Sequence, residues 1–129
     1  MPKILSIDGG GVRGIFPLTI LKSIQNDFKE IDFCRDFDVI SGTSTGSIIA
    51  AGIAFNIELD LLIGLYKKLS ENIFTKSTFG LLKSKFEIKK LDSYLKELFK
   101  EAKMQDAKTN LIIPTTNIIF SKIKFFKSF

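Results

Sequence analysis

The sequence predicts an α/β fold with a mostly parallel sheet flanked by helices. Short apolar runs alternate along the chain with longer segments of helical periodicity. Two of the apolar runs end in glycine-rich loops, and each loop is followed by a helical segment. Alternating strands and helices are typical of parallel sheets, whose sites form at the carboxyl ends of the strands. The chain of 129 residues is long enough for a single core, so we expect one domain over residues 1–129.

Two strand–loop–helix units are expected in the first part of the chain. Residues 3–8, KILSID, form a short apolar run before a glycine cluster and predict a strand. Residues 12–29 carry apolar side chains three or four positions apart, with Pro17 near the start, and predict a helix. Residues 37–41 predict a second strand, and residues 47–54, apolar nearly all round, predict a buried helix.

Two further helices are expected to cover the sheet. Residues 58–69 place leucines and Tyr66 on one helical face, with lysines at the C-terminal end where cations favour the helix dipole. Residues 75–86 predict an irregular segment. Residues 88–103 predict an amphipathic helix whose polar face is mostly lysine and glutamate.

The last part of the chain predicts further strands. Residues 111–116 are a strand candidate in which Pro114 marks an end or an edge of the sheet. Residues 118–129, rich in isoleucine and phenylalanine with interspersed lysines, predict a strand or hairpin. This segment ends on an aromatic run that we expect to be exposed.

The absence of histidine from the chain restricts its chemistry. A Ser-His-Asp triad, a Cys-His pair and histidine-ligated metal sites are excluded by composition. Cys34 is the only cysteine, so neither an intramolecular disulfide nor a cysteine pair for zinc can form. We expect Cys34 to be a buried, small apolar side chain. Any serine chemistry here needs a base other than histidine.

The net charge of +5 comes mostly from lysine. The chain has two arginines and no basic clusters interleaved with stacking aromatic residues, so no nucleic-acid partner is predicted. A basic surface attracts anionic membranes, or is simply solvated. No signal-peptide pattern or apolar stretch of membrane-spanning length is present in the sequence. We expect a cytoplasmic protein whose contact with membranes is peripheral.

The first glycine loop reads DGGGVRG over residues 8–14. Gly9, Gly11 and Gly14 satisfy the GxGxxG pattern of dinucleotide-binding loops, but the second strand does not end in the acidic residue that such a site uses. Three consecutive glycines let backbone N–H groups approach a ligand closely, and the following helix favours negative charge. The loop therefore favours an oxyanion site, while a nucleotide site and a plain structural turn stay open as alternatives.

The second glycine loop reads GTSTG over residues 42–46, between a predicted strand and a predicted helix. A serine between two glycines in such a turn is typical of a nucleophile elbow, where no side chains fit beside the serine. The same letters also fit a small-residue loop without chemistry. Together with the triple-glycine loop after the preceding strand, they favour Ser44 as a nucleophile.

These two loops resemble the motifs of the patatin-like phospholipase family. The resemblance includes DGGGVRG at residues 8–14 and GTSTG at residues 42–46, and extends to YKKLSENIF at residues 66–74 and IKKLDSYLKELF at residues 88–99. It implies a serine acyl hydrolase that uses a Ser-Asp dyad on phospholipid or other acyl-ester lipids. It also implies that no metal and no organic cofactor is needed.

The resemblance assigns roles to individual residues. Ser44 would attack the ester carbonyl and form an acyl-enzyme. The elbow around it consists of Gly42, Thr43, Thr45 and Gly46. Backbone N–H groups of Gly10 and Gly11, with Thr45 or the Arg13 segment, would hold the oxyanion. Arg13 would support the loop or contact lipid phosphate. The implied oxyanion loop comprises Gly9, Gly10, Gly11, Arg13 and Gly14.

The chain departs from the family at the second member of the dyad, an aspartate in a DGG or DGA motif downstream of the serine. After the elbow the aspartates are Asp60, Asp92 and Asp106, and none is followed by glycine. Asp60 and Asp92 lie in helical patterns and are expected to face solvent. Asp8 precedes two glycines but opens the oxyanion loop.

We therefore expect an N-terminal, truncated portion of the family fold that is weakly active or inactive by itself. General-base assistance is typically worth about 10²–10⁴-fold in rate. The alternative is a non-catalytic remnant that binds lipid, or that forms a homo-oligomer by covering its open sheet edge with another copy.

Overall fold

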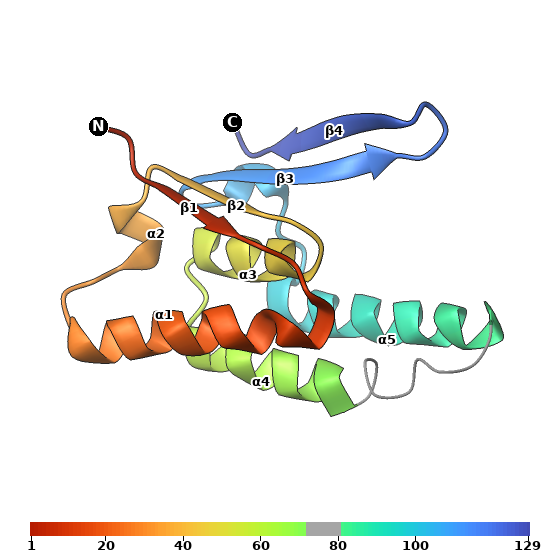
Figure 1. Cartoon of the computed structure of the whole chain (residues 1–129), viewed down its shortest axis with the longest axis horizontal. Coiled ribbons are helices and arrows are strands. Elements are labelled where there is room, and N and C mark those ends of the chain that lie inside the picture. Colours follow the sequence, from red (N-terminus) through yellow and green to blue (C-terminus); the bar gives the residue numbers. More distant parts are fainter. Residues whose placement is uncertain (72–80) are drawn as a thin grey trace.

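The computed structural model describes residues 1–71 and 81–129. The described residues form a four-stranded sheet made, in spatial order, of β1 (Ile4–Ile7), β2 (Val39–Gly42), β3 (Asn110–Asn117) and β4 (Lys122–Lys127) (Figure 1). β1 and β3 both pair in parallel with β2, whereas β4 pairs antiparallel with β3. The predicted α/β class with a mostly parallel sheet is confirmed.

The longer helices of the described residues lie below the strands in Figure 1: α1 (Ile15–Asp27), α3 (Thr45–Ala54), α4 (Leu59–Leu69) and α5 (Leu81–Phe99). The 3-10 turn η1 (Gly11–Gly14) precedes α1, and the single helical turn α2 (Phe33–Asp36) leads into β2. A second 3-10 turn, η3 (Met104–Asp106), leads from α5 to β3. The helix predicted over residues 47–54 thus begins two residues earlier, directly after Ser44.

The start of α5 corrects one prediction. Residues 81–86 were expected to be irregular but are helical, and residues 72–80 lie outside the described residues. Residues 81–90 contain neither glycine nor proline and are rich in leucine and lysine, so helix propensity there is high. The helix ends at Phe99 rather than at residue 103, because Lys100 adopts a left-handed backbone with φ 53°.

Pro114 lies inside β3, so the expectation that it ends the strand is wrong. β3 continues to Asn117 because β4 supplies a partner along this part of the strand. The expectation of an edge is correct for the side of β3 that faces β2. β3 pairs with β2 only through residues 110–112, so Pro114 has no strand beside it on that side. Proline lacks an N–H, and it is tolerated where one side of the strand has no ladder to complete.

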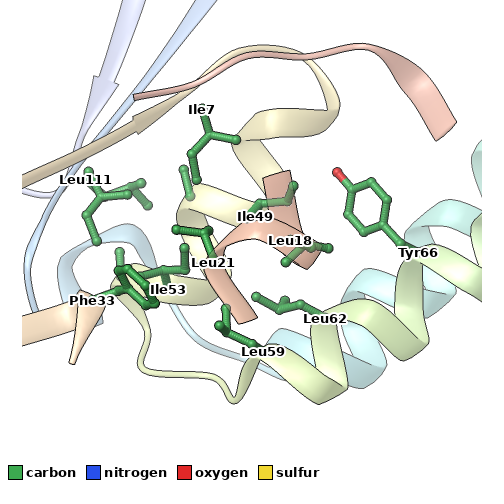
Figure 2. Packing of buried hydrophobic residues seen from close by; sticks show 13 residues of the cluster. Ile7, Leu18, Leu21, Phe33, Ile49, Ile53, Leu59, Leu62, Tyr66 and Leu111 are labelled. Carbon is green, nitrogen blue, oxygen red and sulfur yellow. The ribbon is translucent and has the colours of Figure 1, made fainter. Parts of the chain in front are cut away.

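The core lies between the sheet and the helices. Ile7, Ile40 and Leu111 project from three adjacent strands and are at most 4% exposed. They pack with α3, whose apolar residues are buried as predicted, and with side chains from α1 and α4 (Figure 2). The buried strand residues therefore fix the first two strands side by side, and with them the loops that follow.

Cys34 is buried, as predicted, beside the same core. Burial is the main cause that raises the pKa of its thiol, and the nearby charge of Asp32 adds to the effect. No helix among the described residues has the length and apolar character needed to cross a bilayer.

Candidate active site

Ser44 lies in the sharp turn between β2 and α3, with φ 51° and ψ −128°. This backbone conformation is one that glycine normally occupies, because a Cβ is crowded there. A non-glycine residue held in such a conformation is strained, and strain of this kind concentrates at functional sites. The geometry is the one expected of a nucleophile elbow. The role of Ser44 as a nucleophile stays a prediction.

The glycines of the elbow allow the turn to form. A Cβ on Gly42 would overlap the carbonyl of Gly46, so the strand can approach the helix only without it. A Cβ on Gly46 would overlap the Ile7 carbonyl and would lie 2.8 Å from the Asp8 carbonyl oxygen. Both glycines therefore permit a close backbone approach, and Gly46 brings the first turn of α3 against the end of β1.

The triple-glycine loop contacts the elbow directly. The Gly9 N–H donates to Thr43 Oγ1, and the Gly10 N–H donates to Thr45 Oγ1, each at 3.2 Å. A Cβ on Gly9 would lie 2.6 Å from the Ser44 Cβ, so this position also needs glycine. The structure thus brings together the two loops that were predicted to form one site.

The hydroxyls of Thr43 and Thr45 determine which backbone amides of the triple-glycine loop stay available to a ligand. The Gly9 and Gly10 amides already donate to side chains of the elbow. Gly11 begins η1 with φ 59°, and Thr45 begins α3. The first N–H groups of a helix have no acceptor within that helix, so both amides lie where a ligand can use them. The sequence did not reveal this difference between Gly10 and Gly11.

Tyr66 contacts both glycine loops from the core, a role that the sequence did not predict. Its side chain is 1% exposed, and its hydroxyl donates to the carbonyl of Thr45. Its ring occupies the space that a Cβ on Gly14 would need. Burial raises the pKa of Tyr66 to about 12. A tyrosine on an otherwise apolar helix face was the available signal, since buried hydroxyls usually find a partner.

One hollow lies beside the elbow and another beside the first glycine loop. Thr43 and Ser44 open onto one of about 410 Å³, whose opposite wall is formed by β3 and β4. A second, of about 540 Å³, lies beside Asp8, Gly9 and Arg13. Four of the predicted site residues therefore line these two hollows, and Arg13 lines a different hollow from Ser44. The residues of the β3–β4 wall are Pro114, Thr115, Thr116 and Ile123.

The aspartates considered as bases form other interactions. Asp60 pairs with Lys22 at 2.7 Å with its side chain 68% exposed, and Asp92 pairs with Lys96 at 2.8 Å. Asp106 accepts from a backbone N–H in the first turn of η3. The expectation that Asp60 and Asp92 face solvent is confirmed. Within the part of the chain that the structure describes, no group of three or more Asp, Glu or Cys side chains could hold a metal ion.

The chain is similar to several curated plant proteins. Patatin-like protein 2 of Oryza sativa subsp. indica is 34% identical over 152 residues, which cover 96% of this chain and 38% of that protein. Patatin group A-3 of Solanum tuberosum is 33% identical over 147 residues, covering 99% of this chain and 38% of that protein. Probable inactive patatin-3-Kuras 1 of Solanum tuberosum is 34% identical over 135 residues, covering 95% and 36%.

The chain therefore spans less than two fifths of the length of these relatives, although nearly all of it is matched. The family model described as Patatin-like phospholipase matches residues 5–128, which include both glycine loops and, except for Ile4, the four strands of the described sheet. On this match, the identity to the plant proteins and the observed α/β fold, the chain belongs to the patatin-like phospholipase family.

Proposed function

We propose that this chain forms the nucleophile-bearing part of a lipid acyl hydrolase, in which Ser44 attacks the carbonyl carbon of a phospholipid or other acyl-ester lipid. The observation that carries the proposal is the strained backbone of Ser44, with φ 51°, pressed against the triple-glycine loop. A fold holds such strain only where the surrounding structure imposes it, which supports a functional role.

In the proposed first step, the Ser44 hydroxyl loses its proton and its oxygen forms a bond to the ester carbonyl carbon. The resulting oxyanion accepts hydrogen bonds from the Gly11 and Thr45 amides, which lie at the N-termini of η1 and α3. The N-terminal end of α3 favours the developing negative charge. The C–O bond to the alcohol then breaks, and the alcohol or lysophospholipid leaves with a proton. Water hydrolyses the acyl-serine and regenerates the hydroxyl.

The proton of Ser44 needs an acceptor, and this requirement limits the proposed activity of the chain alone. Histidine is absent from the sequence, and the aspartates after the elbow are not followed by glycine as the family resemblance requires. We therefore propose that the chain alone is weakly active or inactive, and that full activity needs an aspartate from additional sequence.

A non-catalytic lipid-binding module is the second candidate. Among the described residues, no carboxylate forms a hydrogen bond to Ser44, and Asp60, Asp92 and Asp106 are bonded elsewhere. The similarity to a protein described as a probable inactive patatin supports this alternative. In this case the hollows beside Ser44 and Arg13 would hold lipid without turning it over.

Labelling of the purified chain with a fluorophosphonate probe, alongside hydrolysis of a short-chain acyl ester, tests whether Ser44 is reactive in the chain alone. Ser44→Ala should abolish labelling, whereas Ser23→Ala, an exposed serine on α1, should leave it unchanged. Labelling that survives in Ser44→Ala would contradict the proposed nucleophile. Ser44-dependent labelling or turnover would exclude the non-catalytic module, whereas a folded chain that shows neither is expected both of that module and of an acyl hydrolase that lacks its aspartate.

A further inference from the structure

The turn between β3 and β4 projects beyond the ends of β1 and β2 (Figure 1). Ile118, Ile119 and Phe120, which we call the hairpin tip, are 87%, 81% and 68% exposed. Three consecutive large apolar side chains at this level of exposure are costly in water, and contiguous exposed apolar patches mark interaction sites. The hairpin tip therefore needs an apolar partner.

The turn is built in a way that suits an apolar surrounding. The side-chain carbonyl Oδ1 of Asn117 accepts from the N–H groups of Ile119 at 3.0 Å and Phe120 at 3.2 Å. Moving a backbone N–H without a hydrogen-bond partner from water into an apolar medium costs free energy. Because Asn117 accepts from both N–H groups, neither of them adds this desolvation cost when the tip enters an apolar medium. The tip thus presents apolar side chains while its own side-chain cap satisfies backbone donors.

The positive charge around the hairpin tip favours a partner that is anionic as well as apolar. Residues 107–129 contain four lysines and neither aspartate nor glutamate, and so contribute +4 to the net charge of +5. Lys122, Lys124 and Lys127 lie along β4, with Lys122 at the end beside the tip and Lys127 at the far end of the strand, opposite Ile112. Lys124 Nζ lies 5.1 Å from the ring centroid of Phe126, so part of this charge is held over an aromatic side chain. An apolar tip flanked by lysines is complementary to an anionic lipid surface.

We propose that the hairpin tip inserts into the interface of an anionic phospholipid bilayer while the lysines of β4 contact the lipid phosphates. A second copy of the chain is a poorer occupant, because two tips brought together would also bring together two strongly cationic hairpins. The same hairpin forms the wall of the hollow that contains Ser44, through Thr116 and Ile123. Docking therefore directs this hollow toward the lipid, a consequence that rests on the proposed function.

The absence of tryptophan from the chain makes insertion directly measurable. Phe120→Trp places a single reporter at the tip, and Phe28→Trp places one at a 57% exposed position after α1 as the matched control. With phosphatidylcholine vesicles that contain phosphatidylserine, we expect a blue shift and quenching by brominated lipid for Phe120→Trp only. Equal responses of the two reporters, or no response at the tip, would overturn the proposal.

The contribution of the β4 lysines to vesicle binding is tested by replacing all three with neutral residues. Changing Lys122, Lys124 and Lys127 to glutamine should lower vesicle partitioning about fivefold per lysine, on the order of a hundredfold together. A control with the same loss of charge uses the exposed helix-side residues Lys29, Lys67 and Lys89, and should bind far more tightly than the hairpin variant. Equal losses in both sets would show that binding depends on net charge alone and would refute docking by the hairpin.

Two further measurements separate this proposal from the others. Ser44→Ala should partition to vesicles like the unchanged chain, so a failure of the proposed catalysis does not affect the result. Sedimentation velocity without vesicles tests for a second copy. A dimer in which the Phe120→Trp reporter is already blue-shifted and does not respond to vesicles would refute lipid as the occupant.

Discussion

Replacing Ser44 by glycine should stabilise the protein. Ser44 has φ 51° and ψ −128°, a conformation in which a Cβ is crowded and glycine is not. Its Cβ also lies only 2.6 Å from the place that a Cβ on Gly9 would occupy, so Gly9 leaves the space that the Ser44 Cβ uses. Ser44→Gly removes the Cβ, whereas Ser44→Ala removes the hydroxyl and keeps it. The two variants therefore separate the backbone strain from the chemistry of the side chain.

The expected size follows from two opposing effects. Strain at a non-glycine residue of this kind costs about 1–3 kcal/mol. Glycine raises the conformational entropy of the unfolded chain, which offsets about 0.4–1 kcal/mol. Ser44→Gly should therefore exceed Ser44→Ala in free energy of unfolding by about 0.5–2 kcal/mol.

Urea denaturation followed by circular dichroism measures this difference. For slopes of about 1–3 kcal/mol per molar urea, the midpoint of Ser44→Gly should lie roughly 0.2–2 M above that of Ser44→Ala. Ser41 in β2 supplies the matched pair, because glycine in a regular strand is less stable than alanine and the order should reverse. If Ser44→Gly is no more stable than Ser44→Ala, the elbow is not strained and the main support for the proposed nucleophile is lost.

Two further variants and one labelling experiment test the packing of the site and the core. Tyr66→Phe removes the hydrogen bond to Thr45 and should cost about 1 kcal/mol by thermal denaturation. The pKa of Tyr66 is raised from 10.0 to about 12 in the folded protein, so the contribution of this group to the free energy of unfolding is complete below pH 10 and is lost between pH 10 and 12. Tyr66→Phe should therefore lose less stability than the unchanged chain over this range. Gly46→Ala should cost about 1–3 kcal/mol, since its Cβ would overlap the Ile7 carbonyl, and a neutral result in urea would contradict this. Cys34 should react with a thiol reagent only after unfolding, and fast labelling of the native protein would show that it is accessible.

Much of the fold could be predicted because it depends on local patterns. Apolar runs ending in glycine loops identified β1 and β2, helical periodicity identified α1 and α4, and a run of small apolar residues identified α3. The boundaries were less predictable where a pattern was weak. α5 begins at Leu81, ahead of the clear amphipathic repeat, and β3 continues through Pro114 because β4 pairs with it. Both differences arise from propensity or pairing that the apolar pattern does not contain.

The site shows the same division. The place of Ser44 between β2 and α3 follows from neighbouring residues and was predicted. Tyr66 lies 21 residues from the carbonyl that it contacts, and the periodicity identified it only as part of an apolar face. Helical spacing shows that a side chain is buried but does not show which backbone group its hydroxyl meets.

By itself, the sequence determined the strand–glycine–helix units, the position of Ser44 in its turn and the lack of histidine, because these are properties of adjacent residues and of composition. Only the tertiary structure decided that the Gly10 amide donates to a threonine 35 residues away. It also decided that the β3–β4 hairpin forms the wall opposite Ser44. Contacts of this kind depend on strand order and register, which are set by the packing of the whole sheet on its helices.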